Sequence, residues 1–241
     1  MKIRDEISFL EGRLRALGSP DRAVNEKRYL KSDLDFLGVP APVMRRLVKA
    51  WLKEHPDLDR ESLLRLVRGL WRRRLHELRA CGVLLLQERV WTLEDEDLEL
   101  LEWMLRRSKT WAYVDAIAVH VAGPLVERSP GLARTLDRWA SDEDFWVRRS
   151  AMLALLKPLR RGEGDWDRFV RFADSMLEEA EFFIRKAIGW VLREVAKKKP
   201  DRVHQFVSAR IDRMSGVTLR EAVKYLPLED KEALMTRYRR R

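Results

Sequence analysis

The stretch FFIRKAIGWVLREVAKKK, residues 182–199, decides the fold class. Its apolar residues recur at steps of three and four, which places one set on a single face of an α-helix: Ile184, Ile188, Val191 and Val195. Trp190 lies on the neighbouring stripe, at the edge of this apolar face. Arginine and lysine occupy much of the remaining helix surface. The stretch therefore predicts a helix with one buried face and a cationic, aromatic surface that suits a polyanion.

The rest of the chain repeats this plan. Amphipathic periodicity, turn residues and caps predict helices along most of its length, with Asp59 and Asp142 as expected N-caps. No segment alternates with a period of two, so no sheet is expected. The expected helices cover 3–17, 21–30, 42–55, 60–70, 78–90, 92–107, 111–126, 130–140, 143–156, 165–177, 181–197, 200–214, 219–225 and 228–238. The fold class is therefore predicted to be all-α.

Short loops join these helices in pairs, and three residues mark a repeat. Trp111, Arg149 and Trp190 fall near the same place in the second helix of three successive pairs, 38 and 41 residues apart. This spacing is close to the period of HEAT and armadillo repeats, about 40 residues. We therefore predict one HEAT-like-repeat domain over residues 1–241, an α-solenoid whose concave groove is basic and carries these residues.

The charge balance is basic. Lysine and arginine number 49 against 39 aspartates and glutamates, a net charge of +10. Such a surplus favours an acidic partner, which could be nucleic acid, an anionic membrane or an acidic protein. The alternative is that the surplus only aids solubility, and charge alone does not separate the two.

Several functional classes lack their sequence signals. The single cysteine, Cys81, excludes an internal disulfide framework and lies in an apolar run, where a buried inert thiol is expected. The four histidines show no metal-ligand spacing, so no metal is assigned. Neither GxxxxGK nor a GxGxxG after a strand is present, so no nucleotide cofactor is expected. No secretory signal or membrane-spanning stretch is found, and the cytoplasm is the default compartment.

Individual residues leave alternatives open. Asp115 shares a helix face with Trp111, but by itself it could be an ordinary surface acid or one paired with an arginine. Arg149 lies on or beside an apolar stripe and needs a carboxylate, a phosphate or an opening. An ion pair with an acidic residue of the next repeat, with no role in function, would meet this need. Trp190, taken singly, favours core packing.

Five motifs in combination resemble those of the AlkD family of HEAT-like-repeat DNA glycosylases. They occur in the family's order over most of the chain. They are FLGVPAP at 36–42, Leu70-Trp71 followed by Glu77, WAYVD at 111–115, FWVRRSAML at 145–153 and EFFIRKAIGWVLRE at 181–194. The chain departs from the characterised enzyme of the family at Pro40, where that enzyme has a polar residue. A side-chain contact from that position is therefore not expected.

The resemblance implies a function and a set of site residues. AlkD-like enzymes remove N3- and N7-alkylated purines from duplex DNA without a metal and without flipping the base. The family's catalytic aspartate matches Asp115, and its two cleft tryptophans match Trp111 and Trp190. Its DNA-contacting arginine matches Arg149 and its cleft tyrosine matches Tyr29. Two further cations of the 182–199 helix are expected on DNA: Lys186 and Arg193.

The sequence therefore predicts a metal-independent, monofunctional glycosylase of alkylated duplex DNA with no cofactor and no membrane contact. A monomer in the cytoplasm, associated with the nucleoid in a bacterium, is expected. Two alternatives remain at this point. One is a non-catalytic HEAT-repeat protein that binds damaged or branched DNA on the same groove. The other is a helical-repeat scaffold for an acidic protein, in which Asp115 has no chemical role.

Overall fold

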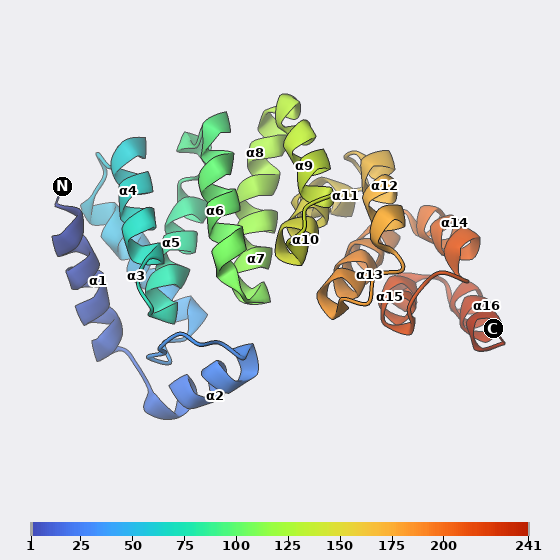
Figure 1. Ribbon diagram of the computed structural model, residues 1–241, viewed down its shortest axis with the longest axis horizontal. Coiled ribbons are helices and arrows are strands. Elements are labelled where there is room, and N and C mark those ends of the chain that lie inside the picture. Colours follow the sequence, from blue (N-terminus) through green and yellow to red (C-terminus); the bar gives the residue numbers. More distant parts are fainter. Residues whose placement is uncertain (1, 241) are drawn as a thin grey trace. The chain divides into compact units, whose positions relative to one another are not determined.

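A computed structural model describes residues 2–240, and it is all-α as predicted (Figure 1). Over these residues the only β contact is an isolated bridge between Asp35 and Leu75. Contacts divide the chain into two compact units that meet in sequence between Ile117 and Ala118. The prediction of one domain over 1–241 is not tested by this division, and each unit is described separately.

The first unit is built from pairs of α-helices with two short 3₁₀ turns. Its elements are α1 (Ile3–Ala16), α2 (Pro20–Leu30), α3 (Ala41–Glu54), α4 (Arg60–Trp71), α5 (His76–Glu88), η1 (Val90–Thr92), η2 (Asp95–Asp97), α6 (Leu98–Ser108) and α7 (Trp111–Ile117). Helix α5 packs against α3, α4 and α7, and α6 packs against α7. The second helices of successive pairs, α3, α5 and α7, therefore form a continuous layer, as in a helical repeat.

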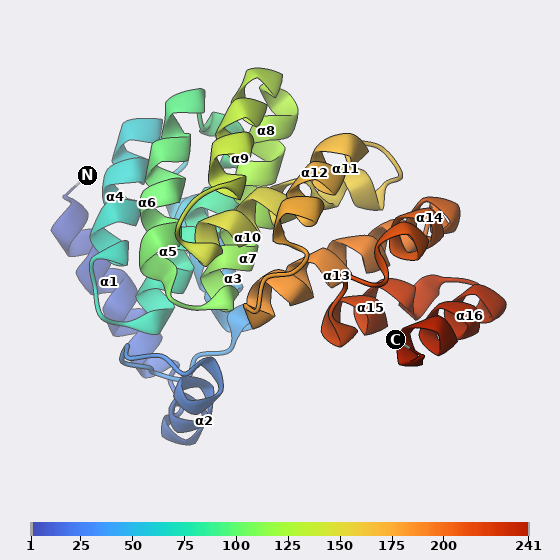
Figure 2. The same cartoon turned by 45° about the vertical axis from the view of Figure 1, so that its right-hand side comes forward.

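The second unit follows the same plan. Its elements are η3 (Ala118–Ala122), α8 (Gly123–Arg128), η4 (Pro130–Leu132), α9 (Ala133–Ala140), α10 (Phe145–Ala154), α11 (Leu156–Arg160), α12 (Trp166–Met176), α13 (Phe182–Ala196), α14 (Pro200–Arg210), α15 (Gly216–Ala222), η5 (Val223–Tyr225) and α16 (Leu228–Arg239). Helices α10, α13 and α15 pack in succession, with α9 beside α10 and α14 beside α13 (Figure 2).

Helix α13 confirms the periodicity that decided the fold class. Ile184, Ile188, Val191 and Val195 are all buried. The buried face is wider than predicted because Gly189 brings α13 close to α15. A Cβ at Gly189 would lie 2.6 Å from the Glu221 Cβ, closer than any real side chain tolerates. Glycine therefore sets the helix–helix separation here.

The helix over 111–126 is the clearest difference from the predicted elements. The structure divides this range into α7, the π-helical turn η3 and α8. Pro124 has no backbone N–H to donate, and its ring crowds the carbonyl four residues earlier, that of His120. A wider turn just before a proline relieves that crowding. The irregularity follows from one residue that periodicity alone does not weigh.

Two further sequence predictions need correction. Asp59 caps α4 as predicted, but the N-cap of α10 is Asp144, whose carboxylate accepts from Trp146 N, rather than Asp142. Asp142 instead accepts from the Asp144 backbone N–H. The three repeat markers also occupy different places: they are the first residue of α7, the fifth of α10 and the ninth of α13. The start of the helix shifts by about one turn from one repeat to the next. Three residues with similar spacing in the sequence therefore do not occupy equivalent positions in their helices.

Candidate functional site

Helix α7 carries the predicted catalytic pair of the first unit. Trp111 is its first residue and Asp115 follows one helical turn later, so both side chains leave the same face. Trp111 and Asp115 are partly exposed rather than core residues. Asp115 also interacts within the chain. The structure therefore keeps an indole and a carboxylate together at the surface of α7.

Tyr29 lies against Trp111, as a shared site requires. Their ring centroids are 5.9 Å apart and the rings meet edge to face at 89°. Tyr29 comes from α2 and is 71% exposed, so most of its surface faces solvent beside the indole. The first unit thus brings together the three site residues that the sequence assigned to it: Tyr29, Trp111 and Asp115.

A buried carboxylate holds the loop that connects α2 to α3. Glu77 is fully buried and accepts hydrogen bonds from three successive backbone N–H groups, those of Leu37, Gly38 and Val39. Gly38 has a φ of +76°, and a Cβ there would lie 2.2 Å from the Ser19 carbonyl oxygen. The FLGVPAP motif and Glu77 are therefore parts of one structural device, which sequence reasoning had not connected.

Tyr113 ties α7 to α5 from the buried side. Its hydroxyl is hydrogen-bonded to His76 Nδ1 at 2.6 Å, and the His76 ring stacks on Phe36 at 4.4 Å. Burial, and then the charge of Arg79, lower the pKa of His76 to about 4. The imidazole is therefore neutral at pH 7 and acts as a packing and hydrogen-bonding group. This contact and the Glu77 loop together fix α2, α5 and α7 around Tyr29 and Trp111.

Arg149 is buried in α10 of the second unit, with 4% of its surface exposed. Its Nη1 donates to the Phe183 carbonyl oxygen at the start of α13, and the guanidinium lies 5.9 Å from the Phe183 ring centroid. Arg149 makes further interactions within the chain. A backbone carbonyl is thus one of its partners, an option that the sequence had not offered. Trp146 is buried against Phe183 at 4.7 Å, as expected of a core residue.

Trp190 is partly exposed, so it does not belong to the buried core of α13. The two predicted DNA-binding cations of this helix both form ion pairs with one acidic residue of α15. Lys186 Nζ lies 2.8 Å from Glu221 Oε1, and Arg193 Nη1 bonds to Glu221 Oε2. Lys224 Nζ also bonds to Glu221 Oε1 at 2.9 Å. A single buried carboxylate therefore gathers three cations.

The Glu221 cluster predicts a specific pH dependence of stability. Burial would raise the pKa of Glu221, but hydrogen bonds from Lys186 and Lys224, with the charge of Arg193, outweigh it and lower the pKa to about 2. Because the folded pKa lies below the ordinary 4.5, the stabilisation is complete above pH 4.5 and is lost as pH falls towards 2. Thermal melting should show Glu221→Gln less stable than the parent at pH 7, with the difference shrinking below pH 4.5. A constant difference across that range would contradict the assignment.

Three further observations concern the cysteine, metal-binding groups and membrane-spanning helices. Cys81 is buried as expected, and burial raises the pKa of its thiol to about 12. Within residues 2–240, no group of three or more His, Cys, Asp or Glu side chains is placed to hold a metal ion. No helix in the same range is long and apolar enough to cross a membrane.

The predicted site residues divide between the two units. Tyr29, Trp111 and Asp115 belong to the first, and the structure brings these three together. The second unit holds the remaining four: Arg149, Lys186, Trp190 and Arg193. Within it, Lys186 and Arg193 share Glu221.

Comparison with known proteins agrees with this architecture. The structure superposes on a protein described as a predicted DNA alkylation repair enzyme from Enterococcus faecalis, with a TM-score of 0.78 and 27% identity over 88% of this chain and 97% of that one. AlkD2 from Streptococcus mutans shares the fold at a TM-score of 0.64 and 14% identity, over 93% of this chain and 99% of that one. No curated protein matches the sequence. The model of a family described as DNA alkylation repair enzyme matches residues 10–226. The chain therefore belongs to the DNA alkylation repair enzyme family.

Proposed function

We propose that this protein is a DNA glycosylase that releases N3- and N7-alkylated purines from duplex DNA without extruding the base, and that Asp115 stabilises the transition state. The observation that carries the proposal is the surface grouping in the first unit. There Asp115 follows Trp111 by one turn of α7, and Tyr29 packs edge-on against the indole. Family membership supplies the substrate class, alkylated DNA.

The chemistry needs little beyond a fixed carboxylate. An N3- or N7-alkylated purine is already cationic, so it departs as a neutral base without an acid. The barrier is the positive charge that develops on the deoxyribose. A preorganised carboxylate stabilises this charge more in the transition state than in the ground state, and the effect is larger away from bulk water. Asp115 takes this role and orients the attacking water.

In the first unit, Trp111 holds the sugar beside that carboxylate. Indole faces attract positive charge, so Trp111 and Trp190 suit a deoxyribose that becomes cationic. Arg149, Lys186 and Arg193 bind backbone phosphates. For Arg149 this contact requires the side chain to turn away from the Phe183 carbonyl that it now binds. Lys186 and Arg193 have to share their charge between Glu221 and DNA.

The decisive experiment is base release from alkylated duplex. Purified protein is incubated with N7-methylguanine-containing duplex in the presence of a chelator, and free base is quantified. Release of 7-methylguanine, with an intact strand carrying an abasic site, supports a metal-independent monofunctional glycosylase. Absence of release, with duplex binding retained, would leave the non-catalytic DNA-binding protein as the better description.

The salt dependence of DNA binding separates the nucleic-acid readings from a protein scaffold. If Arg149, Lys186 and Arg193 each neutralise a phosphate, log Kd should rise with log salt at a slope of about 0.9 for each contact, so these three residues together contribute between about 2 and 3. Binding of a fluorescent, unmodified duplex is measured between about 50 and 200 mM salt. A flat response would favour the acidic-protein scaffold over either DNA-binding reading.

The remaining features follow from the same proposal. The protein works as a monomer and as one HEAT-like domain with a basic concave groove, without a cofactor. It acts in the cytoplasm, on the nucleoid in a bacterium. Sedimentation with and without duplex tests the stoichiometry, and one protein per duplex is expected.

A further inference from the structure

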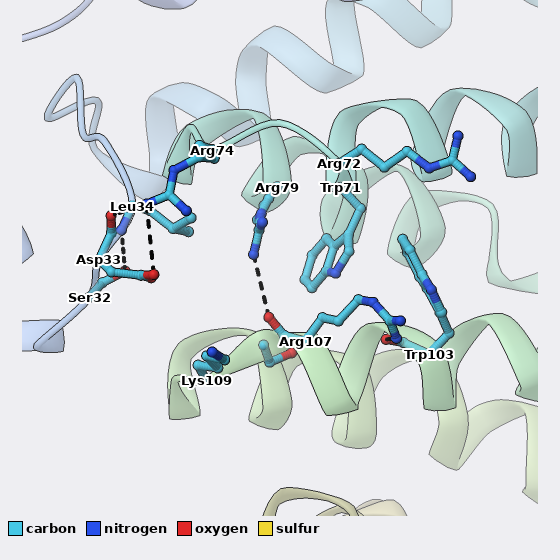
Figure 3. Close-up of a pocket in the computed structure, with 11 residues that line it drawn as sticks. Ser32, Asp33, Leu34, Trp71, Arg72, Arg74, Arg79, Trp103, Arg107 and Lys109 are labelled. Atoms are coloured by element: carbon cyan, nitrogen blue, oxygen red, sulfur yellow. Dashed lines mark hydrogen bonds and ion pairs between the residues drawn. The ribbon is translucent and has the colours of Figure 1, made fainter.

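A cationic pocket of about 320 Å³ lies in the first unit, outside the residues assigned so far (Figure 3). Its walls come from three segments: the turn after α2, the α4–α5 connection and the end of α6. Five of the lining residues are cationic: Arg72, Arg74, Arg79, Arg107 and Lys109. Asp33 is the only acidic residue that lines it. The pocket therefore carries a concentrated positive charge.

Most of the cations that line this pocket lack a carboxylate partner. Arg74 approaches Asp33 at 3.7 Å. The other four, Arg72, Arg79, Arg107 and Lys109, make no ion pair with any residue between 2 and 240. Elsewhere arginines of the same chain are paired in two-point geometry, as Arg210 is with Asp174 and Arg60 with Asp97. Unneutralised like charges repel, so an anion in the pocket would stabilise it.

Aromatic rings hold two of the guanidinium groups in place. Arg107 lies 4.8 Å from the Trp103 ring centroid, and Arg79 lies 5.6 Å from that of Trp71. Arg79 is further fixed by hydrogen bonds to the carbonyls of Arg73 and Arg107. Figure 3 shows the Trp71 indole beside Arg79, with the Arg107 side chain below it in this view. A guanidinium fixed in this way loses less freedom when it binds a phosphate.

The pocket also offers donors with few acceptors. The buried indole N–H of Trp71 has no hydrogen-bond partner among the described residues. Arg72 and Lys109 are exposed, and neither side chain makes a hydrogen bond or ring contact within residues 2–240. Such a lining suits a ligand that is rich in acceptor oxygens and negatively charged, and a phosphate group has both properties.

The position of the pocket suggests the source of that phosphate. Ser32 follows Tyr29 by three residues, and Lys109 precedes Trp111 by two. Lys109 is six residues before Asp115, so their Cα atoms lie within about 23 Å. A duplex advances about 3.4 Å for each base pair. A strand whose sugar reacts at Asp115 therefore has phosphates within reach of the pocket.

From the unpaired cations, their fixed geometry and this position, we propose that the pocket formed by Arg72, Arg79, Arg107 and Lys109 binds a backbone phosphate of the DNA that flanks the reacting nucleotide. The inference rests on the proposed function, because it assumes a duplex at α7. It adds a DNA contact that neither the repeat markers nor the family motifs assign.

The test uses the full chain with Arg72→Gln and Lys109→Asn combined. Neither side chain supports the fold through a contact, and asparagine tolerates the left-handed backbone at Lys109, where φ is +48°. Arg73→Gln is the matched control, since Arg73 is exposed and adjacent but does not line the pocket. Melting temperatures verify that all three proteins fold.

Binding of an unmodified fluorescent duplex is then measured against salt. For the double variant we expect five- to tenfold weaker binding near 100 mM salt and a log–log slope smaller by about 1, with the control near the parent. A parental slope in the double variant would overturn the inference, and base release would still stand as the test of the glycosylase. Titration with inorganic phosphate distinguishes the source. Phosphate binding that the double variant loses, with an unchanged DNA slope, would make the pocket a free-anion site and overturn its assignment to DNA.

Discussion

Asp115→Asn is expected to slow the release of 7-methylguanine from methylated duplex by about 10²- to 10³-fold at saturating protein, with duplex affinity nearly unchanged. The reason is the timing of the charge. The carboxylate faces a neutral sugar before the reaction and a cationic one in the transition state, so its loss mainly raises the barrier. An asparagine keeps the size and the partial polarity of the side chain but not its charge.

Single-turnover measurement separates this effect from binding, because release is followed when all the DNA is bound. Asp57→Asn is a suitable control: Asp57 is an exposed acid of the first unit, in the connection between α3 and α4. The same charge change there should leave the rate within about twofold. If Asp115→Asn released base at the parental rate, Asp115 would have no part in the mechanism, and the water would have to be oriented by another group.

The sequence predicted the helices well because their burial is periodic. The stripe on α13 is buried as expected, and Asp59 caps α4 through the Ser62 N–H. The errors arise where one residue overrides the period. Pro124 forces a wider turn, and Asp144 competes successfully with Asp142 for the helix start. Both are local effects of hydrogen bonding that an apolar count does not contain.

The candidate site was harder to predict because it depends on pairs of residues far apart in sequence. The Tyr29–Trp111 contact joins two residues that are 82 positions apart in sequence, and only the family resemblance named both as site residues. In contrast, the sequence did not indicate that Glu221 would gather Lys186 and Arg193, since all three are ordinary surface residue types. The cationic pocket was missed for the same reason: its cations come from two stretches that are about 30 residues apart, 72–79 and 107–109.

Glu77→Gln is expected to destabilise the protein by about 2–4 kcal/mol, which corresponds to a melting temperature roughly 5–15 °C lower. Glu77 is fully buried, and its two oxygens accept from three backbone N–H groups. A glutamine keeps one acceptor oxygen for these three N–H groups, but its NH₂ replaces the second oxygen and faces the Leu37 N–H. The buried NH₂ has no acceptor there, and the charge that strengthens the backbone hydrogen bonds is gone.

Gly38→Ala tests the same loop through its backbone conformation instead of through the Glu77 carboxylate. The added methyl would meet the Ser19 carbonyl oxygen at 2.2 Å and the Ala23 backbone N at 2.6 Å, on a backbone whose φ is +76°. Gly12→Ala is the matched control. Nothing lies within 4 Å of its Cβ position in α1, so it should be neutral or slightly stabilising.

The loop also leads to α2, and so to Tyr29. Loosening it should therefore release Tyr29 from Trp111 before the protein unfolds. Hydrogen exchange would show this as faster exchange of the amides of α2 in Glu77→Gln than in the parent at a temperature where both are folded. If Glu77→Gln and Gly38→Ala both melted with the parent, the buried carboxylate would not be what holds the loop, and the placement of Tyr29 would need another cause. A lower melting temperature with unchanged α2 exchange would instead mean that the loop supports the core of the first unit but not the position of Tyr29.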